Sequence, residues 1–216
     1  MSIVKIRAAL EIALDAMAGI IPSVNISTST SGTTAAFISA SAHGMTTGMT
    51  VSISGHVGST PDLNGTYLFV STGASAFSLQ HPVTKAAIAS TANGTGGVLT
   101  ANLTAWEGVG FAPVAGVAFQ RVNLLPATPF NPSFGGNHSR ESGYMQVTLY
   151  YPLQRGTNAV MTRAELIRST FPRGSSFTNN GITVHIPKTP EILPGVVQDE
   201  NFVVPVKVQY WSDIFA

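Results

Sequence analysis

The feature that most constrains this chain is a long stretch with almost no charge in its first half. Residues 23–102 contain only two charged side chains, Asp62 and Lys85, whereas the other 136 residues carry 19. Ser, Thr, Gly and Ala dominate the charge-poor stretch. Such a sharp change of composition predicts a domain inserted into another domain, with the host at 1–22 and 103–216 and the insert at 23–102.

The insert has the periodicity of a small all-β domain. Val51 and Ile53 alternate with Ser, and an Asn64-Gly65 turn leads into an apolar run. Turn signals recur about every ten residues, which predicts a small β-sandwich or β-barrel. Its first and last strands are expected to lie close together, as an insertion into a host loop requires.

The host segments predict helices on both sides of the insert, together with several strands. Apolar residues at steps of three and four run from Ile3 to Met17 and again from Val160 to Phe171. Strands are predicted near residues 117–124, 144–151, 182–186 and 202–211. We therefore expect an α+β fold in which two helices pack on a mostly antiparallel four-stranded sheet.

The sequence lacks the motifs of catalysis, phosphate binding and metal binding. It contains no HExxH, no GxSxG, no P-loop, no GxGxxG and no cysteine. Its histidines lack the spacing of metal ligands, so a site formed by His43, His56 and Asp62 competes with histidines in turns on a polar rim. The sequence predicts no catalytic site, no cofactor and no metal centre, and hence a structural protein rather than an enzyme.

Charge is scarce in the whole chain and not only in the insert. Charged residues make up 10% of the sequence, against roughly 25% in an average soluble domain. This scarcity favours a surface buried against other copies, and the alternative is a β protein coated with Ser, Thr and Gly. The net charge of +1 gives no electrostatic case for nucleic-acid binding.

The N-terminal segment does not have the features of a signal peptide. Lys5, Arg7 and Glu11 interrupt its apolar residues, and the chain has no run of about 18 uncharged apolar residues. We therefore expect no membrane span, and a protein that stays in the cytoplasm unless it is assembled into something larger.

Two long segments without periodicity, 126–143 and 187–201, are candidates for contact with a partner. Phe130 and Phe134 lie among the prolines and glycines of the first segment, which favours ordering on a partner. Charge also divides by sign: residues 121–188 have seven bases against two acids, and residues 191–216 have one base against four acids. Opposite surfaces meeting between subunits would explain this division, and ordinary solvated charge is the alternative. The candidate interface residues are Phe130, Phe134, Arg140, Arg155, Glu191, Asp199 and Glu200.

The host segments resemble a family of tail terminators from tailed bacteriophages. The similar segments are MSIVKIRAALEIALDAMAG at 1–19, TAWEGVGFAPVAGVAFQRVNLLPA at 104–127, the stretch from YMQVTLYYPLQRG to IPKTPEI at 144–192, and ENFVVPVKVQYW at 200–211. The resemblance implies a hexameric ring in the virion, at the head-proximal end of a long non-contractile tail. Such a ring stops polymerisation of the tube and presents the surface that joins the head.

The partners that this resemblance implies are further copies of the chain, the tail tube protein and a head–tail connector or stopper protein. Genomic DNA would pass through the lumen without sequence-specific binding. The main alternative is another neck or tube component, such as a head–tail connector or a tail tube subunit, which would also assemble into rings.

The insert resembles an Ig-like or small β-barrel module of phage structural proteins, in AHGMTTGMTVSISG at 42–55, LNGTYLFV at 63–70 and AFSLQ at 76–80. Such modules usually decorate surfaces, so a carbohydrate-binding decoration protein is a further alternative. That function needs an aromatic platform. The insert has Phe37, Tyr67, Phe69 and Phe77, and three of these sit in alternating positions that suit a core.

Overall fold

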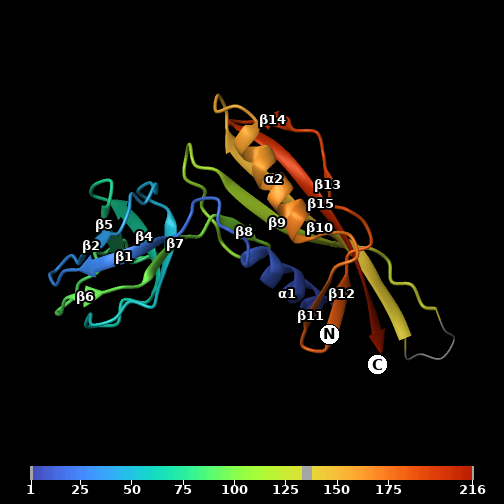
Figure 1. Ribbon diagram of the computed structural model, residues 1–216, viewed down its shortest axis with the longest axis horizontal. Coiled ribbons are helices and arrows are strands. Elements are labelled where there is room, and N and C mark those ends of the chain that lie inside the picture. Colours follow the sequence, from blue (N-terminus) through green and yellow to red (C-terminus); the bar gives the residue numbers. More distant parts are fainter. Residues whose placement is uncertain (1, 133–137, 216) are drawn as a thin grey trace. The chain divides into compact units, whose positions relative to one another are not determined.

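The computed structural model of the chain describes residues 2–132 and 138–215 (Figure 1). Contacts divide the chain into two compact units. The first, which we call the sheet unit, comprises Met1–Met17, Thr104–Ala112 and Ala118–Ala216. The second, the barrel unit, comprises Ala18–Leu103 and Pro113–Val117. Independent folding of residues 23–102 stays a prediction.

The barrel unit is a closed barrel of six strands. Its strands follow the order β2-β5-β4-β3-β7-β1, and β1 pairs again with β2, which closes the sheet. The short β6 pairs with β1 as a seventh strand. The bounds are β1 Val24–Ser29, β2 Ala36–Ser39, β3 Thr50–Ser54, β4 Gly65–Ser71, β5 Ala76–Gln80, β6 Gly94–Thr95 and β7 Val98–Ala101.

Aromatic side chains from three strands fill the barrel. Phe37, Phe69 and Phe77, three of the four aromatic residues of the insert that could form a platform, are fully buried. The ring of Phe77 stacks on Phe37 at 5.0 Å and on Phe69 at 5.2 Å between centroids. Serine and threonine occupy many of the intervening positions, which explains how a barrel of this size folds with so few charges.

The sheet unit is built on two long antiparallel strands, β10 and β15, which pair over fifteen residues from His138↔Phe215 to Pro152↔Asn201. We call this pair the ribbon. The sheet has the order β11-β12-β15-β10-β9-β8, and β13 and β14 also pair with β15. The bounds are α1 Ser2–Asp15, β8 Thr104–Trp106, β9 Phe119–Pro126, β10 His138–Pro152, α2 Asn158–Thr170, β11 Ser176–Asn179, β12 Ile182–His185, β13 Glu191–Ile192, β14 Val196–Gln198 and β15 Asn201–Phe215.

The expected α+β fold, with two helices on a four-stranded sheet, is wrong. Strand residues make up 45% of the chain and helical residues 13%, and the sheet unit is a curled half-barrel of eight strands. Strands form in segments that lack periodicity: β10 begins inside 126–143, and β13 and β14 lie inside 187–201. Backbone hydrogen bonds to a long neighbouring strand fix such segments without apolar alternation, and a twisted sheet of this width curls.

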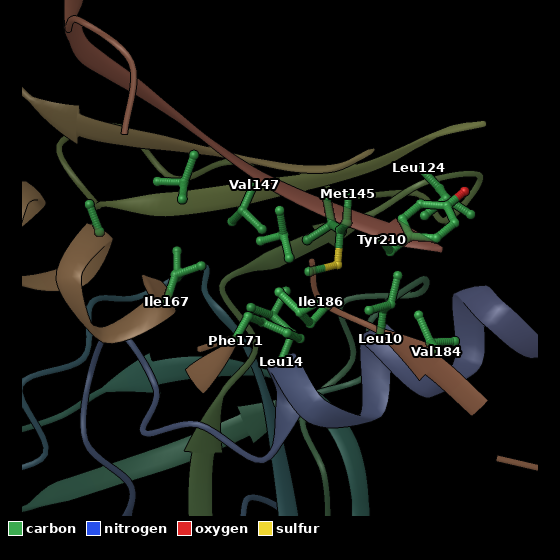
Figure 2. Close-up of a cluster of buried hydrophobic side chains, with 14 of the residues drawn as sticks. Leu10, Leu14, Leu124, Met145, Val147, Ile167, Phe171, Val184, Ile186 and Tyr210 are labelled. Atoms are coloured by element: carbon green, nitrogen blue, oxygen red, sulfur yellow. The ribbon is translucent and has the colours of Figure 1, made fainter. Parts of the chain in front are cut away.

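One face of the half-barrel carries the core of the sheet unit, together with both helices (Figure 2). Leu10 and Leu14 of α1 meet side chains of the ribbon, and Ile167 of α2 belongs to the same cluster. The labelled residues of Figure 2 come from both helices and from β9, β10, β12 and β15, or directly follow these elements. Both helices therefore pack on the same face of the sheet as this core.

Candidate functional site

The two histidines of the suggested metal site are buried structural residues of the barrel unit. His56 Nδ1 donates to the carbonyl of Gly96 at 2.7 Å, and its Nε2 accepts from the hydroxyl of Ser29 at 2.9 Å. His43 Nε2 donates to the carbonyl of Gly73 at 2.8 Å, and its Nδ1 accepts from the backbone N–H of Met45. Both nitrogens of each ring are therefore hydrogen-bonded within the barrel unit, and neither histidine lies on a polar rim.

Aromatic rings separate these histidines from each other. His56 contacts Phe37, His43 contacts Phe69, and Phe77 stacks between the two phenylalanines. Asp62 accepts hydrogen bonds from Asn64 instead. Across residues 2–132 and 138–215, no group of three or more His, Asp or Glu side chains is placed to hold a metal ion. The same residues include no helix that is long and apolar enough to cross a membrane.

The end of the ribbon near the C-terminus carries a cluster of aromatic and charged side chains. Arg140 on β10 lies opposite Asp213 on β15, and its Nε and Nη2 donate to the two carboxylate oxygens at 2.8 and 2.9 Å. The guanidinium lies 4.3 Å from the centroid of the Trp211 ring. His185 stacks on the same ring at 4.3 Å. We call these residues, with His138 and Phe215, the ribbon-end cluster.

Asp213 is the electrostatic centre of this cluster. The hydrogen bonds from Arg140 lower the pKa of the Asp213 carboxyl from 3.8 to about 2, against the opposing effect of burial. His138 Nε2, at 3.1 Å from Asp213 Oδ1, adds to the lowering. The same pairing raises the pKa of Arg140. Arg140, a predicted interface charge, is therefore satisfied within its own subunit.

Phe130 is held at this end of the ribbon with its side chain in solvent. Its backbone exchanges two hydrogen bonds with Arg140, at 2.9 and 2.7 Å, while its side chain is 63% exposed. Phe215 is 75% exposed and lines a cavity of about 380 Å³ together with Lys5, Ile182 and Asp213. Phe134 lies outside the described residues. The ribbon end thus presents exposed aromatic side chains on an ordered backbone.

The structure separates the remaining interface candidates. Asp199 and Glu200 form the turn between β14 and β15 at the other end of the ribbon, and Leu153 N–H donates to the Glu200 carbonyl at 3.1 Å. Arg155 follows in the same loop as Leu153. Glu191 lies between the two ends, opposite Lys207 on β15. The candidates therefore do not form one site.

Several bases of the positive stretch 121–188 are not free to meet a neighbouring subunit. Arg163 is buried and donates from Nε and Nη2 to Gln120 Oε1 at 3.1 and 2.9 Å, and burial lowers the pKa of its guanidinium. Arg168 donates to Glu165 and to the carbonyl of Pro190. Charge counted along the sequence therefore overstates the charge that is available on the surface.

Sequence reasoning missed a row of apolar side chains on the sheet face opposite the helices, where Phe119 and Val203 are buried and Val196 is exposed. Register places Val196 of β14 beside Val203 of β15, then Tyr150 of β10 and Phe119 of β9. The rings of Phe119 and Tyr150 stack at 4.6 Å, and Phe111 lies 5.4 Å from Phe119. We call these five residues the outer apolar band. The adjacent tyrosines that end the 144–151 strand are a sequence signal that this part of the sheet is apolar on both faces.

Comparison with known proteins supplies a family. A family model described as phage tail terminator protein matches residues 84–210, which is more than half of the chain. No curated protein matches the chain. A solved structure is similar with a TM-score of 0.46 and 21% identity, over 52% of this chain and 80% of its own length.

Proposed function

This chain belongs to the phage tail terminator family, and from that membership we propose that its copies close into a ring that caps the tail tube at its head-proximal end. The chain is a structural protein of a bacteriophage tail. The proposed ring is a hexamer that stops polymerisation of the tube and offers a surface to a head–tail connector or stopper protein. DNA crosses its lumen without sequence-specific contacts, and the role requires no catalysis.

The observation that carries this proposal is the extent of the family match. Residues 84–210 include β8 to β14, α2 and most of β15 of the sheet unit, together with β6 and β7 of the barrel unit. The match therefore covers most of the sheet unit, to which we assign the capping role. The barrel unit is proposed to be a decoration.

The exposed aromatic side chains of the ribbon end support assembly. Burial of a phenylalanine that was exposed contributes about 1.5–3 kcal/mol. Phe130 and Phe215 obtain little of this free energy within their own subunit, because both side chains are mostly in solvent. Since their backbone is already ordered on the ribbon, a partner that covers them loses little conformational entropy.

Two alternatives differ from the proposal in ways that can be tested. A tail tube subunit would stack indefinitely, whereas a terminator stops growth. A carbohydrate-binding decoration protein needs exposed aromatic rings on the insert, but Phe37, Phe69 and Phe77 are buried in the barrel core. The burial of these three rings disfavours the second alternative.

The test is to add the purified protein to growing tail tubes and to image them by negative-stain electron microscopy. We expect one ring at one end of each tube and no further growth. Phe130→Ser is expected to keep the melting temperature of the wild type but to lose capping. Val83→Ser, at a residue of the barrel unit that is 81% exposed, is the matched control and should cap normally. Continued stacking, or a large drop in the melting temperature of Phe130→Ser, would contradict the proposal.

A further inference from the structure

At one end the outer apolar band reaches the edge strand β14. Val196 and Val197 of β14 are 55% and 66% exposed, on opposite faces of that strand. One side of β14 pairs with β15, and among the described residues no strand pairs with its other side. β14 has only three residues, with Pro194 before it and Asp199 and Glu200 after it, and such features disfavour backbone pairing at an edge. A partner would therefore meet the exposed side chains of β14.

The two margins of the band carry charges of opposite sign. Asp199 and Glu200 follow β14 directly, and both are exposed. At the other margin Arg121 of β9 is exposed, with its Cζ 5.8 Å from the centroid of the Tyr150 ring. Within residues 2–132 and 138–215, none of these three residues has an opposite charge within salt-bridge distance. Among these residues, the β14 margin therefore carries unpaired negative charge, and the Arg121 margin carries unpaired positive charge.

The register of the sheet puts both margins at the same end of the ribbon. Val196 lies beside Val203, and Arg121 lies opposite Thr148, two residues before Tyr150, the partner of Val203. A head-to-tail ring needs two different surfaces on opposite sides of each subunit. The β14 margin lies at one edge of the sheet, and Arg121 lies one strand in from the opposite edge, because Ala105 of β8 pairs beside it. The two margins therefore lie on opposite sides of the sheet unit.

We propose that the β14 margin of one copy packs against the Arg121 margin of the next copy. This inference rests on the proposed ring and names the surface that closes it. Val196 would meet Phe111 of the next copy, so that the outer apolar band continues from subunit to subunit. Asp199 and Glu200 would face Arg121. A second copy is the occupant because the complementary charge and the complementary apolar surface are both present on this chain.

Disulfide trapping tests the contact directly, because the chain has no cysteine. The variant Asp199→Cys/Arg121→Cys places one thiol at each margin, at two positions that would face each other between copies. The two positions are separated by β15 and β10, and strands lie about 4.8 Å apart, so a bond within one copy is out of reach. Mild oxidation, with and without tail tubes, should give a ladder of covalent oligomers on a non-reducing gel. Asp199→Cys/Arg173→Cys, with a thiol at another exposed base, is the matched control and should give no ladder.

The outcomes separate this inference from the ring-capping role. Wild-type capping without a ladder from the Asp199→Cys/Arg121→Cys variant would overturn the contact and leave the capping role standing. A ladder without wild-type capping would support the contact and remove the capping role. A ladder from the Arg173→Cys control instead would show that the receiving surface is assigned wrongly.

Charge exchange gives a second readout at the same contact. Asp199→Lys/Glu200→Lys and Arg121→Glu are each expected to lose ring formation, because each brings like charges together. The triple variant that combines them restores opposite charges and is expected to recover rings on tail tubes. Normal rings from both separate variants, or no recovery in the triple variant, would overturn the proposal.

Discussion

At the scale of single residues, the pair of Arg140 and Asp213 makes a prediction about acid stability. The pKa of Asp213 is lowered from 3.8 to about 2, chiefly by hydrogen bonds from Arg140. A carboxyl whose pKa is lowered by folding contributes its full stabilisation at pH values above the pKa that it has in the unfolded chain. This contribution is lost as the pH falls from about 4 to 2. NMR titration of Arg140→Ala should show the Asp213 pKa moving back toward 3.8. An unchanged titration would show that Arg140 is not the cause.

Tyr210 makes the corresponding prediction on the alkaline side. Its side chain is buried, its hydroxyl has no hydrogen-bond partner among residues 2–132 and 138–215, and burial raises its pKa to about 12. The neutral phenol is therefore favoured in the folded state, and stability should fall as the pH rises from 10 toward 12.

Tyr210→Phe tests this prediction through chemical denaturation at several pH values. At pH 7 the free energy of unfolding of the variant should equal that of the wild type or exceed it by about 1 kcal/mol, because a buried unsatisfied hydroxyl is removed. It should also lose less stability between pH 10 and 12 than the wild type. A loss of several kcal/mol at pH 7 would reveal a hydrogen bond from this hydroxyl.

At the scale of elements, Gly143 explains how the long strand β10 fits between β9 and β15. A Cβ at this position would collide with the carbonyl oxygen of Leu125 and lie 2.7 Å from the Tyr210 hydroxyl. Gly143→Ala is therefore expected to destabilise the sheet unit by about 1–3 kcal/mol, the usual range for overpacking.

A double-mutant cycle separates the two contacts of this added methyl group. Gly143→Ala in the Tyr210→Phe background removes the clash with the hydroxyl and should cost less than Gly143→Ala alone. Equal losses of stability in the two backgrounds would show that the added methyl group clashes only with the backbone of β9. Urea denaturation provides the measurement.

At the scale of the whole molecule, the two units predict separable folding. Every residue of the core cluster in Figure 2 belongs to the sheet unit, and the barrel has its own buried aromatic core. Replacing residues 23–102 with a short Gly/Ser linker should leave a sheet unit that is soluble and melts cooperatively. The isolated barrel, residues 18–103, should also show a cooperative transition. Insoluble or non-cooperative products would argue against an insertion.

The sequence by itself determined the features that depend on local periodicity. The apolar stripe from Ile3 to Met17 specified α1, and the alternation of residues 144–151 specified the middle of β10. The alternation of Val51 and Ile53 with serine predicted a strand with one buried face, and both residues are buried. Each of these elements buries one face, and a buried face leaves a repeat that can be read along the chain.

Only the tertiary structure decided the features that depend on partners distant in sequence. His138–Gly143 and Val196–Gln198 have no apolar period, and they are strands because β15 offers them hydrogen-bond partners. Asp213 is the partner of Arg140 for the same reason, 73 residues away. Eight strands in place of four, the burial of Arg163 and the outer apolar band all arise from such pairings. The periodicity of apolar residues in a sequence shows which side of a segment is buried. Strand pairing is made by backbone N–H and C=O groups, which are the same in every sequence, so the sequence does not show which strands pair.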